Sequence, residues 1–90
     1  MKRFFIIFEG IVQGVGFRYT AIQIAHSLGL TGTVYNSDSG NVEVEVQGSQ
    51  EAIDEFLRQI LKERTFIHIY DYSIKKIPLK DGESSFKVIY

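Results

Sequence analysis

The chain has 90 residues, 44% of them hydrophobic, which predicts one domain over residues 1–90 with a hydrophobic core of its own. Its ten basic and eleven acidic residues leave a net charge of −1, whereas a nucleic-acid-binding module normally carries a strongly basic face, so we expect no nucleic-acid partner. The chain has no cysteine, which excludes disulfides, thiolate nucleophiles and metals held by sulfur.

The amino-terminal segment is predicted to be a buried strand. Residues 4–10 are mostly aromatic and β-branched, as in strands that are covered on both faces. The apolar run from Phe4 to Phe8 is five residues long, too short for the roughly 7–15-residue apolar core of a signal peptide. No stretch approaches the ~20 apolar residues of a transmembrane helix. We therefore expect a cytoplasmic protein without a membrane partner.

A glycine-containing loop and an amphipathic helix come next. Residues 11–17 include Gly14 and Gly16 and predict the loop. From about residue 18 to residue 28, apolar side chains recur at helical spacing, and Gly29 supplies a C-terminal stop. This pattern predicts the first helix of the domain.

Two strands follow the first helix. Residues 31–36 and 42–47 predict a hairpin, because they flank a turn-forming stretch at residues 38–41. Valine and glutamate alternate from Val42 to Val46, so we expect one face of the hairpin to be buried and the other to be solvated.

The carboxyl-terminal half is predicted to contain a second helix and two more strands. Ser49 is the expected N-cap of this helix, which has a broad apolar stripe and is predicted to end near Arg64. Residues 66–77 and 85–90 are predicted strands on either side of a loop at residues 78–84.

The order of these elements predicts the fold. Strand, helix, strand, strand, helix and strand with two right-handed crossovers give an α+β ferredoxin-like βαββαβ sandwich, in which an antiparallel sheet with an additional fifth strand carries two helices on one face. Phe5 and Ile7 then point to the helix-free face, where either the carboxyl-terminal strands or a second copy would cover them. We favour the first option and expect a monomer, with a weak dimer as the alternative.

The loop at residues 10–18 is the most informative functional feature. It joins a strand to a helix and places successive main-chain N–H groups at a helix N-terminus, where unpaired donors and the helix dipole favour an anion. Gly14 and Gly16 permit positive φ angles and let an oxyanion approach the backbone closely. Arg18 adds a planar guanidinium whose donors match two phosphoryl oxygens.

Two better-known phosphate motifs do not fit this loop. A P-loop requires Lys followed by Ser or Thr after its last glycine, where this chain has Phe17 and Arg18. A dinucleotide-binding fingerprint requires a third glycine, where this chain has Tyr19. The loop is therefore predicted to be another kind of anion site, and a strand-to-helix turn with a surface arginine is the alternative.

Two segments of the chain resemble the acylphosphatase family. Residues 12–18, Val-Gln-Gly-Val-Gly-Phe-Arg, are similar to its signature, and residues 28–36, Leu-Gly-Leu-Thr-Gly-Thr-Val-Tyr-Asn, are similar to its second motif. Matches at residues 42–48 and 86–90 extend the resemblance over essentially the whole chain. The resemblance implies a ferredoxin-like fold that hydrolyses a small-molecule acyl phosphate to a carboxylate and inorganic phosphate.

The resemblance also implies roles for individual residues. Arg18 is the phosphate-binding arginine and Asn36 the asparagine that orients water; the terminal carboxylate of Tyr90 is expected near Arg18. The resemblance places the phosphate among the main-chain N–H groups of Gln13, Gly14, Val15, Gly16, Phe17 and Arg18. We expect no metal and no cofactor. At Ile11 and Tyr35 the family often has basic residues, so steering of an anionic substrate is expected to be weaker here.

Two other functions stay open at this stage. The domain either binds an anion without turnover, or handles carbamoyl phosphate like the domain that opens the hydrogenase-maturation carbamoyltransferase. The absence of zinc-finger cysteines counts against the second option. Glu9, His26 and His68 are expected to be surface residues without a catalytic or metal-binding role.

Overall fold

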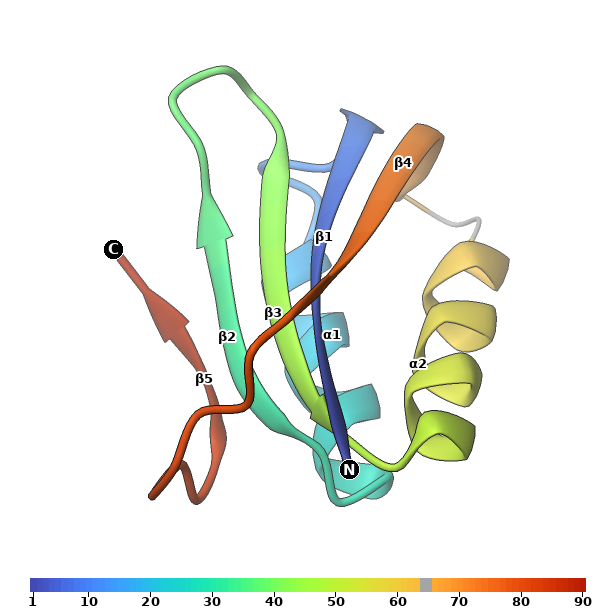
Figure 1. Ribbon diagram of the computed structural model, residues 1–90. Coiled ribbons are helices and arrows are strands. Elements are labelled where there is room, and N and C mark those ends of the chain that lie inside the picture. The colour runs from blue at the N-terminus through green and yellow to red at the C-terminus, as the bar shows by residue number, and fades with distance from the viewer. Residues whose placement is uncertain (64–65) are drawn as a thin grey trace.

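The computed structural model describes residues 1–63 and 66–90 (Figure 1). Its elements follow the predicted order: β1 Lys2–Ile11, α1 Phe17–Ser27, β2 Thr31–Asn36, β3 Val42–Gly48, α2 Gln50–Lys62, β4 His68–Ile77 and β5 Phe86–Ile89. The predicted end of the second helix near Arg64 lies outside the described residues. Within the described residues, no helix is long and apolar enough to cross a membrane.

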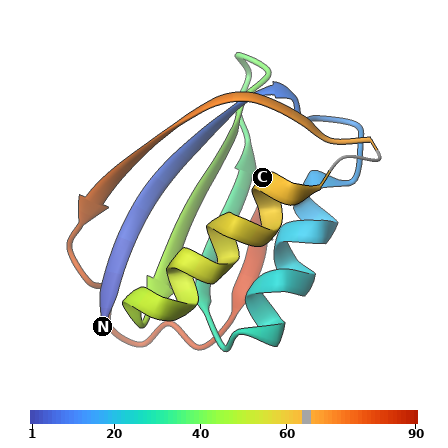
Figure 2. The same cartoon turned by 90° about the vertical axis from the view of Figure 1, so that its right-hand side faces the viewer.

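The five strands form one sheet in the order β4-β1-β3-β2-β5, and both helices cover the same face of it (Figure 2). Pairing is antiparallel between β1 and β3, β1 and β4, and β2 and β3, which confirms the predicted ferredoxin-like arrangement. The added strand differs from the expected antiparallel sheet, because β5 pairs parallel to β2. After β4, at one edge of the sheet, the chain crosses to the opposite edge, where it forms β5 beside β2.

Strand alternation directs one set of side chains into the core. Ile6 and Phe8 of β1 lie opposite Val44 and Val42 of β3, and all four are fully buried. The helices supply the other side of this core with Phe17, Ala21, Ala25, Ile53, Phe56 and Ile60. The apolar spacing of both predicted helices therefore marks the faces that pack on the sheet.

The helix-free face carries an unexpected buried charge. Phe5 and Ile7 lie half-buried on this face, as predicted, and they pair with Glu45 and Glu43 of β3. Arg3, two residues before Phe5, has only 2% of its surface exposed. The sequence pattern does not predict this burial.

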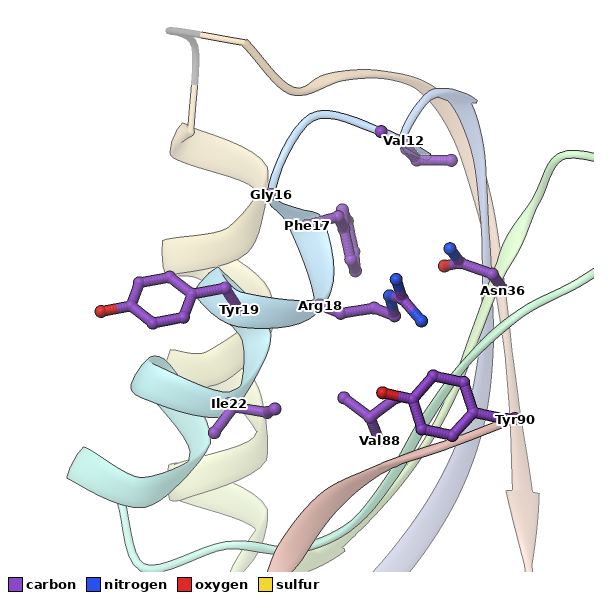
Figure 3. Close-up of a pocket in the computed structure, with 10 residues that line it drawn as sticks. Val12, Gly16, Phe17, Arg18, Tyr19, Ile22, Asn36, Val88 and Tyr90 are labelled. Carbon is purple, nitrogen blue, oxygen red and sulfur yellow. The ribbon is translucent and has the colours of Figure 1, made fainter.

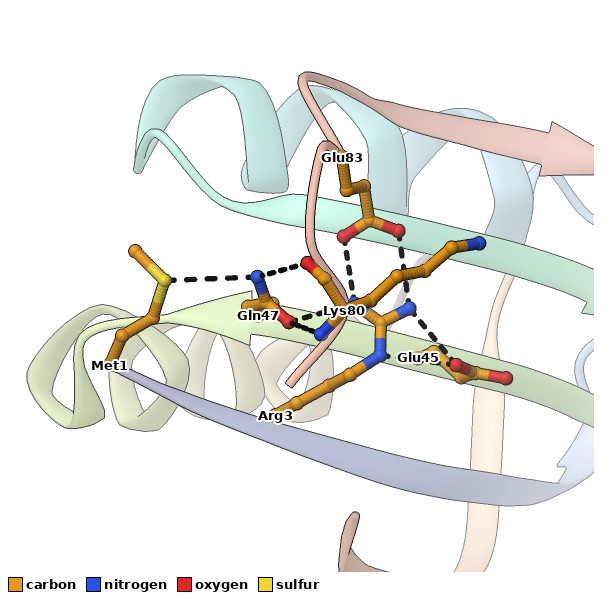
Figure 4. Close-up of polar contacts among 6 residues, drawn as sticks. All are labelled: Met1, Arg3, Glu45, Gln47, Lys80 and Glu83. Carbon is orange, nitrogen blue, oxygen red and sulfur yellow. Dashed lines mark hydrogen bonds and ion pairs between the residues drawn. The ribbon is translucent and has the colours of Figure 1, made fainter. Parts of the chain in front are cut away.

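Arg3 and Gln47 fasten the β4–β5 connection to the sheet (Figure 4). The Arg3 guanidinium donates to Glu83 at 2.8 and 3.1 Å and to Glu45 at 2.9 and 3.2 Å. Gln47 accepts from the Lys80 main-chain N–H at 2.9 Å and donates to the Lys80 carbonyl at 3.1 Å. These bonds hold the crossing segment that delivers β5 to its edge position.

The helix ends differ in how they are capped. Ser49 caps α2 as predicted, since its hydroxyl accepts from the Ala52 N–H at 3.1 Å. The N-cap of α1 is Gly16, which forms no side-chain cap hydrogen bond. His26 is exposed near the other end of α1, but its Nε2 lies 3.2 Å from the Phe86 carbonyl oxygen and so links α1 to β5.

Candidate active site

The loop between β1 and α1 presents unpaired main-chain donors. Gly14 has φ of 72° and Gly16 has φ of 83°, which confirms that both adopt the left-handed conformation. A Cβ atom added at either position would meet nothing within 4 Å, so the space beside the loop is open. Among the hydrogen bonds between described residues, none uses the main-chain N–H groups of residues 13–18. The loop leads into the N-terminus of α1, where unpaired main-chain donors favour an anion.

A pocket of about 330 Å³ lies against this loop (Figure 3). That volume is at the lower end of the range for small-molecule sites. The Arg18 guanidinium extends from α1 across the pocket toward Asn36 at the end of β2. The lining residues are Val12, Gly14, Gly16, Phe17, Arg18, Tyr19, Ile22, Asn36, Val88 and Tyr90. The fold therefore brings Arg18 and Asn36 to one site, although 18 positions separate them in the sequence.

The side chain of Asn36 forms no hydrogen bond with another described residue. Its carboxamide takes part in none of the hydrogen bonds found between described residues, and its Oδ1 is buried. Among buried side-chain polar atoms of residues 1–63 and 66–90 that are not on exposed residues, Oδ1 is the one left unsatisfied. A buried acceptor left without any partner costs about 1–3 kcal/mol, so this oxygen is available to a water molecule or a ligand. The terminal torsion of Asn is soft, so rotation can present either amide atom to the pocket.

Tyr90 contacts Arg18 through its ring. The Arg18 Cζ lies 5.7 Å from the centroid of that ring, at cation–π distance. The ion pairs between described residues include none between Arg18 and the Tyr90 carboxylate, and the expected approach of that carboxylate to Arg18 stays a prediction. Strand β5 ends at Ile89 beside Tyr35 of β2, and this pairing brings Tyr90 to the pocket.

The pocket lining contains no acidic residue and no histidine. Glu9, His26 and His68 are exposed and lie outside it, as predicted. In the part of the chain that the structure describes, no three His, Cys, Asp or Glu side chains are grouped so that they could hold a metal ion. The polar side chains of the lining are therefore those of Arg18, Asn36, Tyr19 and Tyr90, beside the main-chain groups of the loop.

Comparison with known proteins identifies the family. The model of the family described as Acylphosphatase matches residues 4–88. An acylphosphatase of Clostridium acetobutylicum is 43% identical over 90 residues, covering 100% of this chain and 99% of the relative. The chain belongs to the acylphosphatase family. It is therefore an enzyme, a hydrolase of phosphorus-containing acid anhydrides, as the signature at residues 12–18 predicted.

Solved acylphosphatases share the fold over its full length. The crystal structure of acylphosphatase from Bacillus subtilis matches with a TM-score of 0.93 and 33% identity, and each chain covers 100% of the other. The domain also occurs inside a larger protein. Full-length HypF in a phosphate- and nucleotide-bound form matches with a TM-score of 0.92 and 33% identity over 99% of this chain, which spans 12% of HypF.

Proposed function

We propose that this acylphosphatase hydrolyses the carboxyl-phosphate bond of small acyl phosphates, with the phosphoryl group held by the β1–α1 loop and Arg18 and the attacking water held by Asn36. One observation carries the proposal. Gly14, Gly16 and Phe17 of the loop, whose main-chain N–H groups are unpaired within the described residues, line one pocket together with Arg18 and Asn36.

The loop and Arg18 supply electrostatic stabilisation. In phosphoryl transfer, charge spreads over three equatorial oxygens, so catalysis consists mainly of positioning and preorganised donors. The main-chain N–H groups of residues 13–18 face the phosphoryl oxygens from one side, and the planar Arg18 fork binds two of them from the other.

The lining has no acidic residue or histidine to act as general acid or base, and the chemistry of an acyl phosphate makes these groups unnecessary. A carboxylate leaves without protonation because its acid has a pKa of ~4, so no general acid is needed. An amide cannot act as a strong base, but Asn36 can orient a water molecule for in-line attack. The water oxygen bonds to phosphorus while the phosphorus–acyl oxygen bond breaks, and the carboxylate leaves with that electron pair. The water's proton passes to a phosphoryl oxygen of the substrate.

The direct test is an assay with acetyl phosphate in the presence of EDTA. The wild-type protein should release acetate and phosphate, and Arg18→Gln should lower kcat/KM by about 10²-fold or more, the usual loss for a transition-state donor. Arg58→Gln is the matched control, because Arg58 is exposed on α2 and pairs with Glu55 outside the pocket.

The same assay separates the alternative functions. A wild-type protein that binds inorganic phosphate but releases no acetate would be an anion-binding module. Turnover of carbamoyl phosphate without turnover of acetyl phosphate would favour carbamoyl-phosphate handling.

A further inference from the structure

The side chain of Gln13 joins the phosphoryl-binding loop to the hairpin that carries Asn36. Its Nε2 lies 2.7 Å from the carbonyl oxygen of Ser37 and 2.9 Å from that of Asn41. Ser37 directly follows Asn36, and Asn41 directly precedes Val42, the residue that pairs with Asn36 across β2 and β3. The two acceptor residues, Ser37 and Asn41, are thus the direct neighbours in sequence of the paired residues Asn36 and Val42.

Within the part of the chain that the structure describes, no other hydrogen bond joins this loop to the hairpin. Among the hydrogen bonds between described residues, these two are the ones that tie residues 12–16 to an element other than α1. The Ser37 N–H donates to the same Asn41 carbonyl at 2.9 Å. Gln13 therefore binds the β2–β3 hairpin at the hydrogen bond that closes its turn.

We infer that Gln13 is a positioning residue, whose carboxamide fixes the distance between the phosphoryl-binding loop and Asn36. The inference rests on the proposed function. The Asn36 carboxamide has no hydrogen bond of its own within the described residues, so its place depends on the backbone from which it projects. Gln13 fixes that backbone relative to the loop, and with it the alignment of water and phosphorus.

The Gln13 side chain is not itself a phosphate ligand in this arrangement. A carboxamide has two N–H donors, and here both are used by carbonyl oxygens. The main-chain N–H of Gln13 is one of the donors proposed for the phosphoryl group, whereas its side chain acts on the position of Asn36. The two parts of one residue therefore serve both sides of the pocket.

Loss of this link should act on turnover more than on binding. Reacting atoms must lie about 3–3.5 Å apart and in line, and a misplacement of ~1 Å can cost ~10²-fold in rate. Gln13→Met keeps the side-chain length and removes both donors. We expect its kcat for acetyl phosphate to fall about 10- to 100-fold, with inhibition by inorganic phosphate nearly unchanged.

A double-mutant cycle with Asn36→Ala separates positioning from a structural role. If Gln13 acts through Asn36, adding Gln13→Met to Asn36→Ala should lower kcat little further. Gln59→Met is the matched control, because the Gln59 carboxamide donates to Glu55 on α2, away from the pocket. It should keep wild-type kcat.

Three outcomes would overturn the inference while the wild-type protein turns over acetyl phosphate. These are a folded Gln13→Met variant with wild-type kcat, losses that multiply in the double mutant, and phosphate inhibition that weakens in step with kcat. If the wild-type protein releases no acetate, the proposed function itself fails and the inference with it.

A second variant covers the case in which Gln13→Met does not fold. In Gln13→Glu the carboxylate faces two carbonyl oxygens, and one O–H donor returns when the side chain is protonated. The kcat of this variant should therefore rise toward that of the wild type as the pH is lowered. A kcat ratio of variant to wild type that does not change with pH would contradict the inference.

Discussion

The carboxamide of Asn36 projects from the end of β2 and has no hydrogen-bond partner among the residues that the structure describes, whereas that of Gln13 donates to two carbonyls. The two amides therefore suit different tasks. The two hydrogen bonds of the Gln13 amide fit the positioning role that we propose for it, and the unpaired Asn36 amide is available to a water molecule.

Asn36→Ala tests the task given to the unpaired amide. The variant should lower kcat by about 10²–10³-fold, as for other single transition-state groups, because water loses its orientation. Inhibition by inorganic phosphate should hardly change, since the loop and Arg18 remain. Steady-state kinetics with phosphate as the inhibitor give both values, and a collapse of phosphate inhibition would make Asn36 a structural residue instead.

At this scale, the structure places Arg18 and Asn36, the two residues that short motifs single out, in the lining of one pocket, and their roles stay predictions. Sequence reasoning did not find the Gln13 link, because its acceptors are main-chain carbonyls 24 and 28 residues away and any residue type supplies them. It also missed the ring contact of Tyr90 with Arg18, which depends on how β5 pairs with β2.

The two helices differ in the residue that caps the N-terminus of each. The N-cap of α2 is Ser49, whose hydroxyl satisfies a main-chain N–H, while the N-cap of α1 is Gly16 and leaves its donors unpaired. The N-terminus of α1, which has no side-chain cap, lines the pocket, whereas the Ser49-capped N-terminus of α2 does not. The sequence predicts a local feature such as the Ser49 cap, because the cap and its partner are close in the chain. It does not predict the order of the five strands, which depends on pairing between distant segments.

Ser49→Ala should destabilise the protein without affecting the site. Loss of a serine N-cap costs about 1 kcal/mol of unfolding free energy, because the Ala52 N–H loses its acceptor. Urea denaturation measures this value, and kcat for acetyl phosphate should stay at the wild-type level. A lowered kcat in the folded variant would mean that α2 is coupled to the pocket.

Across the whole molecule, the Arg3 network links the first strand to the β4–β5 connection. Glu83 is largely buried beside Arg3. Burial opposes its ionisation, but the hydrogen bonds from Arg3 and Thr31 and the charge of Arg3 outweigh burial, so the pKa of Glu83 lies below its usual range. Sequence reasoning could not foresee this pair, because 80 positions separate its members.

The lowered pKa of Glu83 predicts loss of stability in acid. A carboxyl whose pKa is lower in the folded state stabilises that state above its unfolded pKa of ~4.3, and this contribution is lost as the pH falls through the folded value. Glu83→Gln should lower the unfolding free energy at pH 7 by about 1.5–3 kcal/mol and flatten its decline below pH ~4. Urea denaturation from pH 7 to pH 3 measures both effects, and an unchanged acid decline would contradict the role of this pair.

The proposed function requires that water attacks phosphorus rather than the acyl carbon. Hydrolysis of acetyl phosphate in ¹⁸O-labelled water tests this directly, because the label marks the atom that was attacked. Mass spectrometry of the products should find one ¹⁸O in inorganic phosphate and none in acetate. Label in acetate would show attack at the carbonyl carbon and would contradict a site in which the loop and Arg18 hold the phosphoryl group opposite Asn36.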